Sequence, residues 1–138
     1  MRFSLMGTAL MSDDPAGAAR WFTEHFGFQV GIDIGWYVNT QHPDHPAMAL
    51  DFVDRAHDSL PEALRGRLVE GTLLGFVVED VDAEERRLRT AGVDIVLPLA
   101  TEPWGQRRFQ LRGPDGVVVE VLQMVTPDPA WMAANGYA

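Results

Sequence analysis

The stretch SDDPAGAARWFTEHFG, residues 12–27, decides how this chain is organised. Each of residues 12–14 has a side chain that can cap a helix, and Pro15 suits the first helical turn. Gly27 is the residue type that ends a helix in the left-handed conformation. Apolar residues recur at helical spacing in between, with Phe22 at the centre. The stretch therefore predicts one amphipathic helix with defined ends.

A second stretch, DAEERRLRTAG at residues 82–92, repeats this plan in the other half of the chain. Asp82 and Glu85 have the spacing of a capping box, and Gly92 closes the helix. One strand-like segment precedes each helix and three come after it. The expected strands are 3–11, two within 28–39 that flank Gly35, then 47–54, 72–78, 94–100, 106–112 and 117–123.

The repeated unit predicts an α+β fold made of two βαβββ modules in tandem, which together form a curved, mixed sheet with a cleft. We expect a single domain over residues 1–125. Module one covers about 3–54, a linker about 55–70, and module two about 71–125. Residues 126–138 form a C-terminal tail, with one more helical turn expected after Pro129.

Composition excludes several classes of function. The 138 residues carry 20 acids against 11 basic residues, all of them arginine, so the net charge is −9. No basic stripe is available to bind a nucleic-acid backbone. Cysteine is absent, which excludes disulfides and thiolate metal sites. The run of apolar residues in the N-terminal segment is too short to span a membrane, so we expect a cytoplasmic protein.

The order of these segments resembles the vicinal oxygen chelate superfamily, which includes glyoxalases, bleomycin-resistance proteins and extradiol dioxygenases. The resemblance rests on DDPAGAARWFTEHFGF, GFVVEDVDAEERRLRTAGV and PWGQRRFQLRGPDGVVVEVLQ, and it covers about residues 3–125. It implies the tandem βαβββ fold and a small-molecule cleft. It does not select one activity, because such folds carry unrelated chemistries.

Metal-dependent members of that superfamily bind one divalent ion through the first strands and the last strands of the two halves. By this resemblance the last-strand ligand falls on Glu120, and Asp51 is a possible second acid. The first-strand positions fall at or near Gly7 and Leu73, whose side chains cannot coordinate a metal. We therefore expect no metal cofactor; if one binds, Glu120 and Asp51 are the expected ligands.

Glu120 interrupts an otherwise apolar strand, Val-Val-Val-Glu-Val-Leu. Strand alternation places Val117, Val119 and Val121 on one face and Glu120 on the other. The valine face is expected to pack under the helices. Three roles stay open for the acid. It can be a hydrated residue bridged to Arg107 or Arg108, a contact for a polar or cationic ligand, or a metal ligand with unusual partners.

These observations lead to two main hypotheses and to a third possibility, an interaction or regulatory domain with an empty cleft. The first is a metal-independent protein that sequesters a small, antibiotic-type molecule and acts as a homodimer. Its expected ligand-binding residues are Trp36, Phe52, Trp104, Arg107, Phe109 and Glu120. The alternative is a metal-dependent lyase, isomerase or dioxygenase of the same superfamily that uses Glu120 as a ligand. The sequence identifies no catalytic residue.

Overall fold

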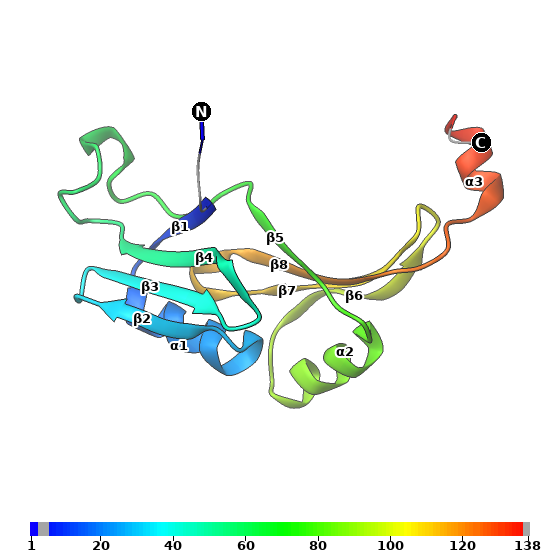
Figure 1. The fold of residues 1–138 in the computed structure, drawn as a ribbon, viewed down its shortest axis with the longest axis horizontal. Helices are drawn as coiled ribbons and strands as arrows, with labels where there is room; N and C mark the ends of the chain where they lie inside the picture. The colour runs from blue at the N-terminus through cyan, green and yellow to red at the C-terminus, as the bar shows by residue number, and fades with distance from the viewer. Residues whose placement is uncertain (3–5, 137–138) are drawn as a thin grey trace. The chain divides into compact units, whose positions relative to one another are not determined.

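A computed structural model describes residues 1–2 and 6–136 of the chain (Figure 1). The expected first strand, 3–11, is seen from Met6 onward, and its start at residues 3–5 lies outside the described residues. The strands are β1 (Met6–Ser12), β2 (Gln29–Asp33), β3 (Tyr37–His42), β4 (His45–Asp54), β5 (Leu73–Val77), β6 (Ile95–Glu102), β7 (Gln106–Arg112) and β8 (Val118–Met124). The helices are α1 (Pro15–Phe26), α2 (Val81–Thr90) and α3 (Pro129–Ala134), with single 3-10 turns at Glu62–Leu64 and Pro114–Gly116.

The strands form two four-stranded sheets with the same topology. Their orders are β1-β4-β3-β2 and β5-β8-β7-β6. In each sheet the first and last strands of the module pair in parallel, and the remaining pairs are antiparallel. This arrangement confirms the α+β fold with two βαβββ modules in tandem.

The chain divides into two compact units. Unit 1 consists of residues 1–71 and 114–116, and unit 2 of residues 72–113 together with 117 onward. In each unit one helix covers one face of the sheet, α1 in unit 1 and α2 in unit 2 (Figure 1). The cleft and the domain boundaries expected from the sequence stay predictions.

Helix α1 has the ends that its sequence predicts. The side chain of Asp14 accepts a hydrogen bond of 2.9 Å from the amide of Gly17, so Asp14 is the N-cap. Gly17 leaves room for this contact, because a Cβ atom there would lie 2.0 Å from the Asp14 carboxylate. Gly27 ends the helix with a φ of 74°. Phe22 is fully buried beneath the helix, 5.6 Å from the ring of Phe52 on β4.

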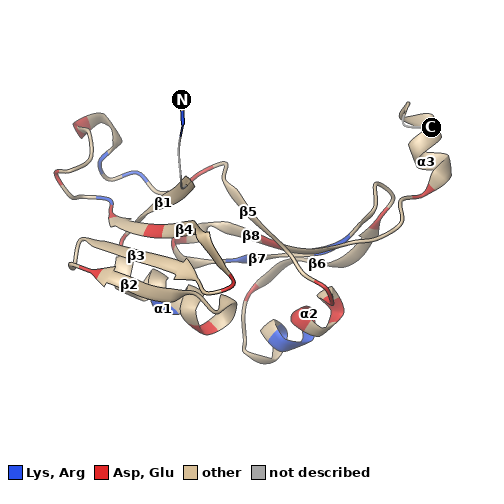
Figure 2. Ribbon diagram, viewed as in Figure 1, with Lys and Arg blue, Asp and Glu red and all other residues tan. Residues whose placement is uncertain are grey.

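Helix α2 is capped two residues before Asp82, so the predicted capping box is wrong. The N-cap is Asp80, which accepts a hydrogen bond of 2.9 Å from the amide of Ala83. Asp82 therefore lies inside the first turn, and Glu85 forms an ion pair with Arg89 instead of closing a box. Acidic residues are at the start of the helix and arginines at its end (Figure 2), which matches the helix dipole.

The valine face of β8 packs in the core of unit 2, as predicted. Val119 and Val121 are fully buried and pair with residues of β7, Val121 with Phe109. The opposite face of the sheet carries polar side chains, among them Glu120.

No helix within the described residues is long and apolar enough to cross a membrane.

Candidate functional site

The polar face of unit 2 centres on Glu120, whose carboxylate is held by two donors from β7. Gln110 lies directly opposite on the neighbouring strand and donates a hydrogen bond of 2.7 Å from Nε2 to Oε2. Arg108 donates to the same oxygen from Nη1 at 2.6 Å. The Glu120 side chain is only 11% exposed, so this pairing compensates a largely buried charge. Of the three roles left open by the sequence, the bridge to Arg108 is the one observed.

Arg108 joins Glu120 to a second acid. Its Nε and Nη2 atoms both donate to Oε1 of Glu102, at 3.1 and 2.8 Å. The pKa of Arg108 is raised, first by its hydrogen bond to Glu120 and then by Glu102. The guanidinium therefore stays charged, and two carboxylates share one cation. With both acids ionised, this group has an excess of one negative charge.

The indole of Trp104 lies over this group. The Arg108 guanidinium carbon is 5.3 Å from the ring centroid, within the range of a cation–π contact. The indole Nε1 donates a hydrogen bond of 2.8 Å to Oε1 of Gln106, which orients the ring. Trp104 is 39% exposed, and the ring of Trp131 lies 6.2 Å away. Unit 2 thus presents exposed aromatic surface directly beside a charged group.

Unit 1 has an acid at the corresponding place, Asp51 on β4. Asn39, directly opposite on β3, donates a hydrogen bond of 2.7 Å to Oδ1. The hydroxyl of Tyr37 donates to Oδ2 at 2.9 Å. The pKa of Tyr37 is raised, first by burial and then by its hydrogen bond to Asp51. Among the residues that the structure describes, none forms an ion pair with Asp51.

Trp36, the predicted binding residue of unit 1, stacks on His57. The two rings are 3.9 Å apart and almost parallel, with an interplanar angle of 2°. The Nδ1 atom of His57 accepts a hydrogen bond of 3.2 Å from the amide of Ser59. One face of Trp36 is therefore covered by the segment that comes after β4.

Three of the six predicted binding residues lie away from the polar faces. Phe52 and Phe109 are 1% and 0% exposed and belong to the core beneath the helices. Arg107 points to the other side of β7 from Arg108 and binds Asp82 of α2, with Nε and Nη2 at 2.8 and 2.6 Å from its carboxylate. This pairing lowers the pKa of Asp82. Ligand binding by any of the six residues stays a prediction.

Sequence reasoning did not single out Gln110 and Glu102, and it left the choice between the two arginines open. The turn at residues 114–116 would have identified the neighbours of Glu120, because it sets the register between β7 and β8. A hairpin centred on Asp115 pairs residue 110 with 120 and residue 108 with 122, as observed. Strand alternation from that register then places Arg108 beside Glu120 and Phe109 on the valine face.

The residues around Glu120 do not fit a divalent ion in this arrangement. Gly75 of β5 is the register partner of Glu120, and Ala9 of β1 is the register partner of Asp51 in unit 1. Neither residue offers a side-chain donor, nor do Gly7 and Leu73, which lie two residues earlier on the same strands. A metal ion at Glu120 would have to compete with the Arg108 guanidinium for the carboxylate. The described part of the chain contains no group of three histidine, aspartate or glutamate side chains arranged to hold a metal.

Comparison with known proteins identifies the family. A family model described as Glyoxalase/Bleomycin resistance protein/Dioxygenase superfamily matches residues 5–121. The chain belongs to this superfamily. The resemblance inferred from the sequence is thereby confirmed.

Several solved structures share the fold. TnmS3, an antibiotic binding protein from Streptomyces sp. CB03234, is 25% identical with a TM-score of 0.69, over 90% of this chain and 98% of its own. A lactoylglutathione lyase from Agrobacterium tumefaciens is 22% identical with a TM-score of 0.68, over 88% and 94%. A glyoxalase/bleomycin resistance protein/dioxygenase from Nocardioides is 19% identical with a TM-score of 0.73, over 91% and 85%. No curated protein matches the chain.

Proposed function

We propose that this superfamily member binds a small, antibiotic-type molecule and sequesters it without using a metal. The proposal rests on the pairing of Glu120, the acid at the superfamily's last-strand ligand position, with a neighbouring arginine. Its carboxylate is compensated by Arg108 under the exposed ring of Trp104. A carboxylate held by a guanidinium is suited to hydrogen bonding with a ligand rather than to coordinating a metal ion.

The chemistry of this face indicates what it would recognise. Trp104 supplies a flat apolar surface for a planar part of the ligand. The group of Arg108, Glu102 and Glu120 offers both donors and acceptors, and its excess negative charge favours polar or cationic substituents. Binding would come from stacking and burial, with charged groups setting orientation.

The similarity to TnmS3 supports an antibiotic-type ligand, because that protein is described as an antibiotic binding protein and is similar over nearly its whole length. Sequestration of such a molecule would protect the cell that makes or meets it. The cytoplasmic location expected from the sequence belongs to this proposal.

A metal-dependent enzyme is the second candidate. It is favoured by the presence of an acid at each module's fourth strand, Asp51 and Glu120, where the superfamily's enzymes carry ligands. Metal analysis of the purified protein separates the two candidates. If the purified protein holds one divalent ion per chain tightly and Glu120→Ala loses it, the enzymatic function is favoured over sequestration.

The direct test of sequestration is a thermal-shift panel of planar aromatic amines, run with and without EDTA. We expect stabilisation by a subset of compounds, unchanged by EDTA, and loss of that stabilisation in Trp104→Ala. Arg108→Gln should lose it as well. Its matched control Arg112→Gln should not, because Arg112 is 62% exposed and pairs only with Asp94 among the described residues. Mass spectrometry of the released compound should show it chemically unchanged; a converted product would contradict sequestration.

The proposal includes a homodimer. Strand β2 lies at the edge of its sheet and exposes apolar side chains, with Val30 at 49% and Ile32 at 55%. An exposed apolar edge strand is a surface that proteins usually cover. Sedimentation velocity at micromolar concentration should show a dimer, and a pure monomer would contradict it.

A further inference from the structure

The C-terminal helix α3 lies beyond residues 5–121, the part of the chain that the family model matches. It has no buried residue, so packing in a core does not explain its position. Backbone hydrogen bonds nevertheless connect the residues before α3 to the turn between β6 and β7. The amide of Val125 donates to the carbonyl of Gly105, and the amide of Asp128 to that of Pro103, each at 2.9 Å.

These bonds fall on both sides of Trp104. Gly105 has a φ of 96°, and a Cβ atom there would lie 2.9 Å from the Val125 carbonyl oxygen. A glycine is therefore required for the close approach of the two segments. The tail is held against the backbone that carries Trp104, and this contact fixes where helix α3 begins.

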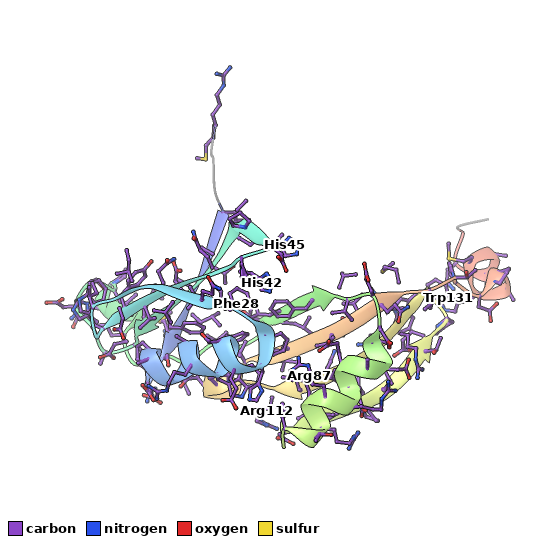
Figure 3. The ribbon with its side chains drawn as sticks, turned by 60° about the horizontal axis from the view of Figure 1, so that its bottom comes forward. Phe28, His42, His45, Arg87, Arg112 and Trp131 are labelled. Atoms are coloured by element: carbon purple, nitrogen blue, oxygen red, sulfur yellow. The ribbon has the colours of Figure 1, made fainter. Side chains whose placement is uncertain are left out.

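Helix α3 carries Trp131, which is labelled in Figure 3. The Asp128 side chain caps the helix by accepting from the amides of Ala130 and Trp131, at 2.7 and 3.3 Å. The Trp131 ring then lies 6.2 Å from that of Trp104, with the two planes at 56°. Two indoles are thus held near each other by hydrogen bonds of the backbone and the cap.

The two rings are in tilted contact, since packed aromatic pairs have centroids about 4.5–7 Å apart. Aromatic carbons in contact lie about 3.5 Å apart, so two parallel rings that hold a third between them are separated by about 7 Å. A planar group therefore enters between the indoles only after one ring moves off the other and rotates toward parallel. Helix α3 has no buried residue, so Trp131 can make this movement without disturbing a core. Trp104 is 39% exposed and Trp131 is half-buried, so neither ring is enclosed in the core.

We propose that Trp104 and Trp131 form a clamp that stacks on both faces of one planar, fused aromatic ring of the ligand. The inference rests on the proposed function, because the clamped ring belongs to the sequestered molecule. It assigns a ligand-contacting role to a residue outside the superfamily's matched region. The group of Arg108 with its two acids, adjacent to Trp104, favours a positive charge on the ring.

The test uses proflavine, a planar tricyclic cation, and amantadine, a non-planar cation, as probes in isothermal titration calorimetry. We expect proflavine to bind and amantadine to bind at least about 10-fold more weakly, since only a flat ring fits between the indoles. Trp131→Ala should weaken proflavine about 10-fold, and Trp131→Phe should weaken it less, because one aromatic face is kept. Met132→Ala, on the same helix, is the matched control and should leave affinity unchanged.

A second measurement does not depend on how Trp131→Ala folds. The chain has four tryptophans, and Trp131→Phe keeps the other three. Proflavine should quench the emission of the wild-type protein with the affinity found by calorimetry, and it should quench the emission of Trp131→Phe less. Proflavine binding that Trp131→Ala does not weaken, emission that is not quenched, or equal binding of amantadine would each overturn the clamp and leave sequestration standing. No binding of proflavine to the wild-type protein overturns the clamp, whereas sequestration falls only if the whole panel also fails.

Discussion

Each module has an acid at the same position of its fourth strand, but the side chains that donate hydrogen bonds to the two carboxylates differ. Asp51 on β4 lies opposite an amide side chain, Asn39, and Glu120 on β8 lies opposite another, Gln110. In each module the second donor comes from two residues earlier on the third strand. That donor is the Tyr37 hydroxyl in unit 1 and the Arg108 guanidinium in unit 2.

The difference between the donors decides what each acid can do. Asp51 is bound by neutral groups, so its negative charge is not balanced by a described neighbour. Glu120 is balanced by a cation that a second acid, Glu102, also shares. A duplicated backbone geometry can therefore carry an unbalanced charge in one module and a charge network in the other.

The largest expected effect is in unit 2. Glu120→Ala leaves two part-buried donors of β7, Arg108 Nη1 and Gln110 Nε2, without the acceptor that they share, although Arg108 keeps its pairing with Glu102. We expect the free energy of unfolding to fall by about 3 kcal/mol, measured by urea denaturation. Asp94→Ala, which removes an exposed partner of Arg112, is the control and should cost less than about 0.5 kcal/mol.

A double-mutant cycle with Arg108→Met sharpens this result. If the two side chains act as one unit, the loss in the double variant should be smaller than the sum of the two single losses, because each single variant already removes the ion pair that they share. Strict additivity of the two single losses would contradict the network.

The second largest effect on the free energy of unfolding is expected in unit 1. Asp51→Asn keeps the shape of the side chain and one acceptor for the Tyr37 hydroxyl, and it buries no unpaired cation. We expect a loss of about 1 kcal/mol in the same urea experiment. A loss as large as that of Glu120→Ala would break the comparison, since it would mean that charge balance is not what distinguishes the two acids.

The smallest effect is a titration. The pKa of Tyr37 is raised above its ordinary value, first by burial and then by Asp51. The folded state therefore holds the phenolic proton more tightly than the unfolded chain. This stabilisation is fully present below the unfolded pKa of about 10 and is lost as pH rises through the higher folded pKa. In a Tyr137→Phe background Tyr37 is the only tyrosine, so ultraviolet absorbance of the phenolate reports it alone.

Asp51→Asn should move this titration of Tyr37 to lower pH, because the carboxylate that disfavours the phenolate is removed. An unchanged midpoint would show that burial alone raises the pKa. The Glu120→Gln variant is the control and should leave the titration where it is.

Sequence patterns predicted the fold well because they are local. A cap within residues 12–14, the closing Gly27 and the valine face of β8 each depend on a few neighbouring residues. All three are confirmed, with Asp14 as the cap. The start of α2 was misjudged because Asp80 and Asp82 are both good caps.

The candidate site was harder to predict because it depends on pairing between strands. The sequence placed one of two consecutive arginines beside Glu120 but could not say which. Phe109 was expected in the cleft, yet the β7–β8 register turns it into the core. A shift of one residue in register exchanges every side chain between the faces, so these assignments need the hairpin geometry.

By itself the sequence determined the two βαβββ modules, the superfamily and the presence of an acid on the final strand, because helix periodicity, caps and strand alternation are written in adjacent residues. Only the tertiary structure decided that Arg108 neutralises this acid, that Asp51 has neutral partners, and that the tail brings Trp131 to Trp104. Those contacts join residues from different strands and from the tail, and their chemistry appears only when packing brings the segments together.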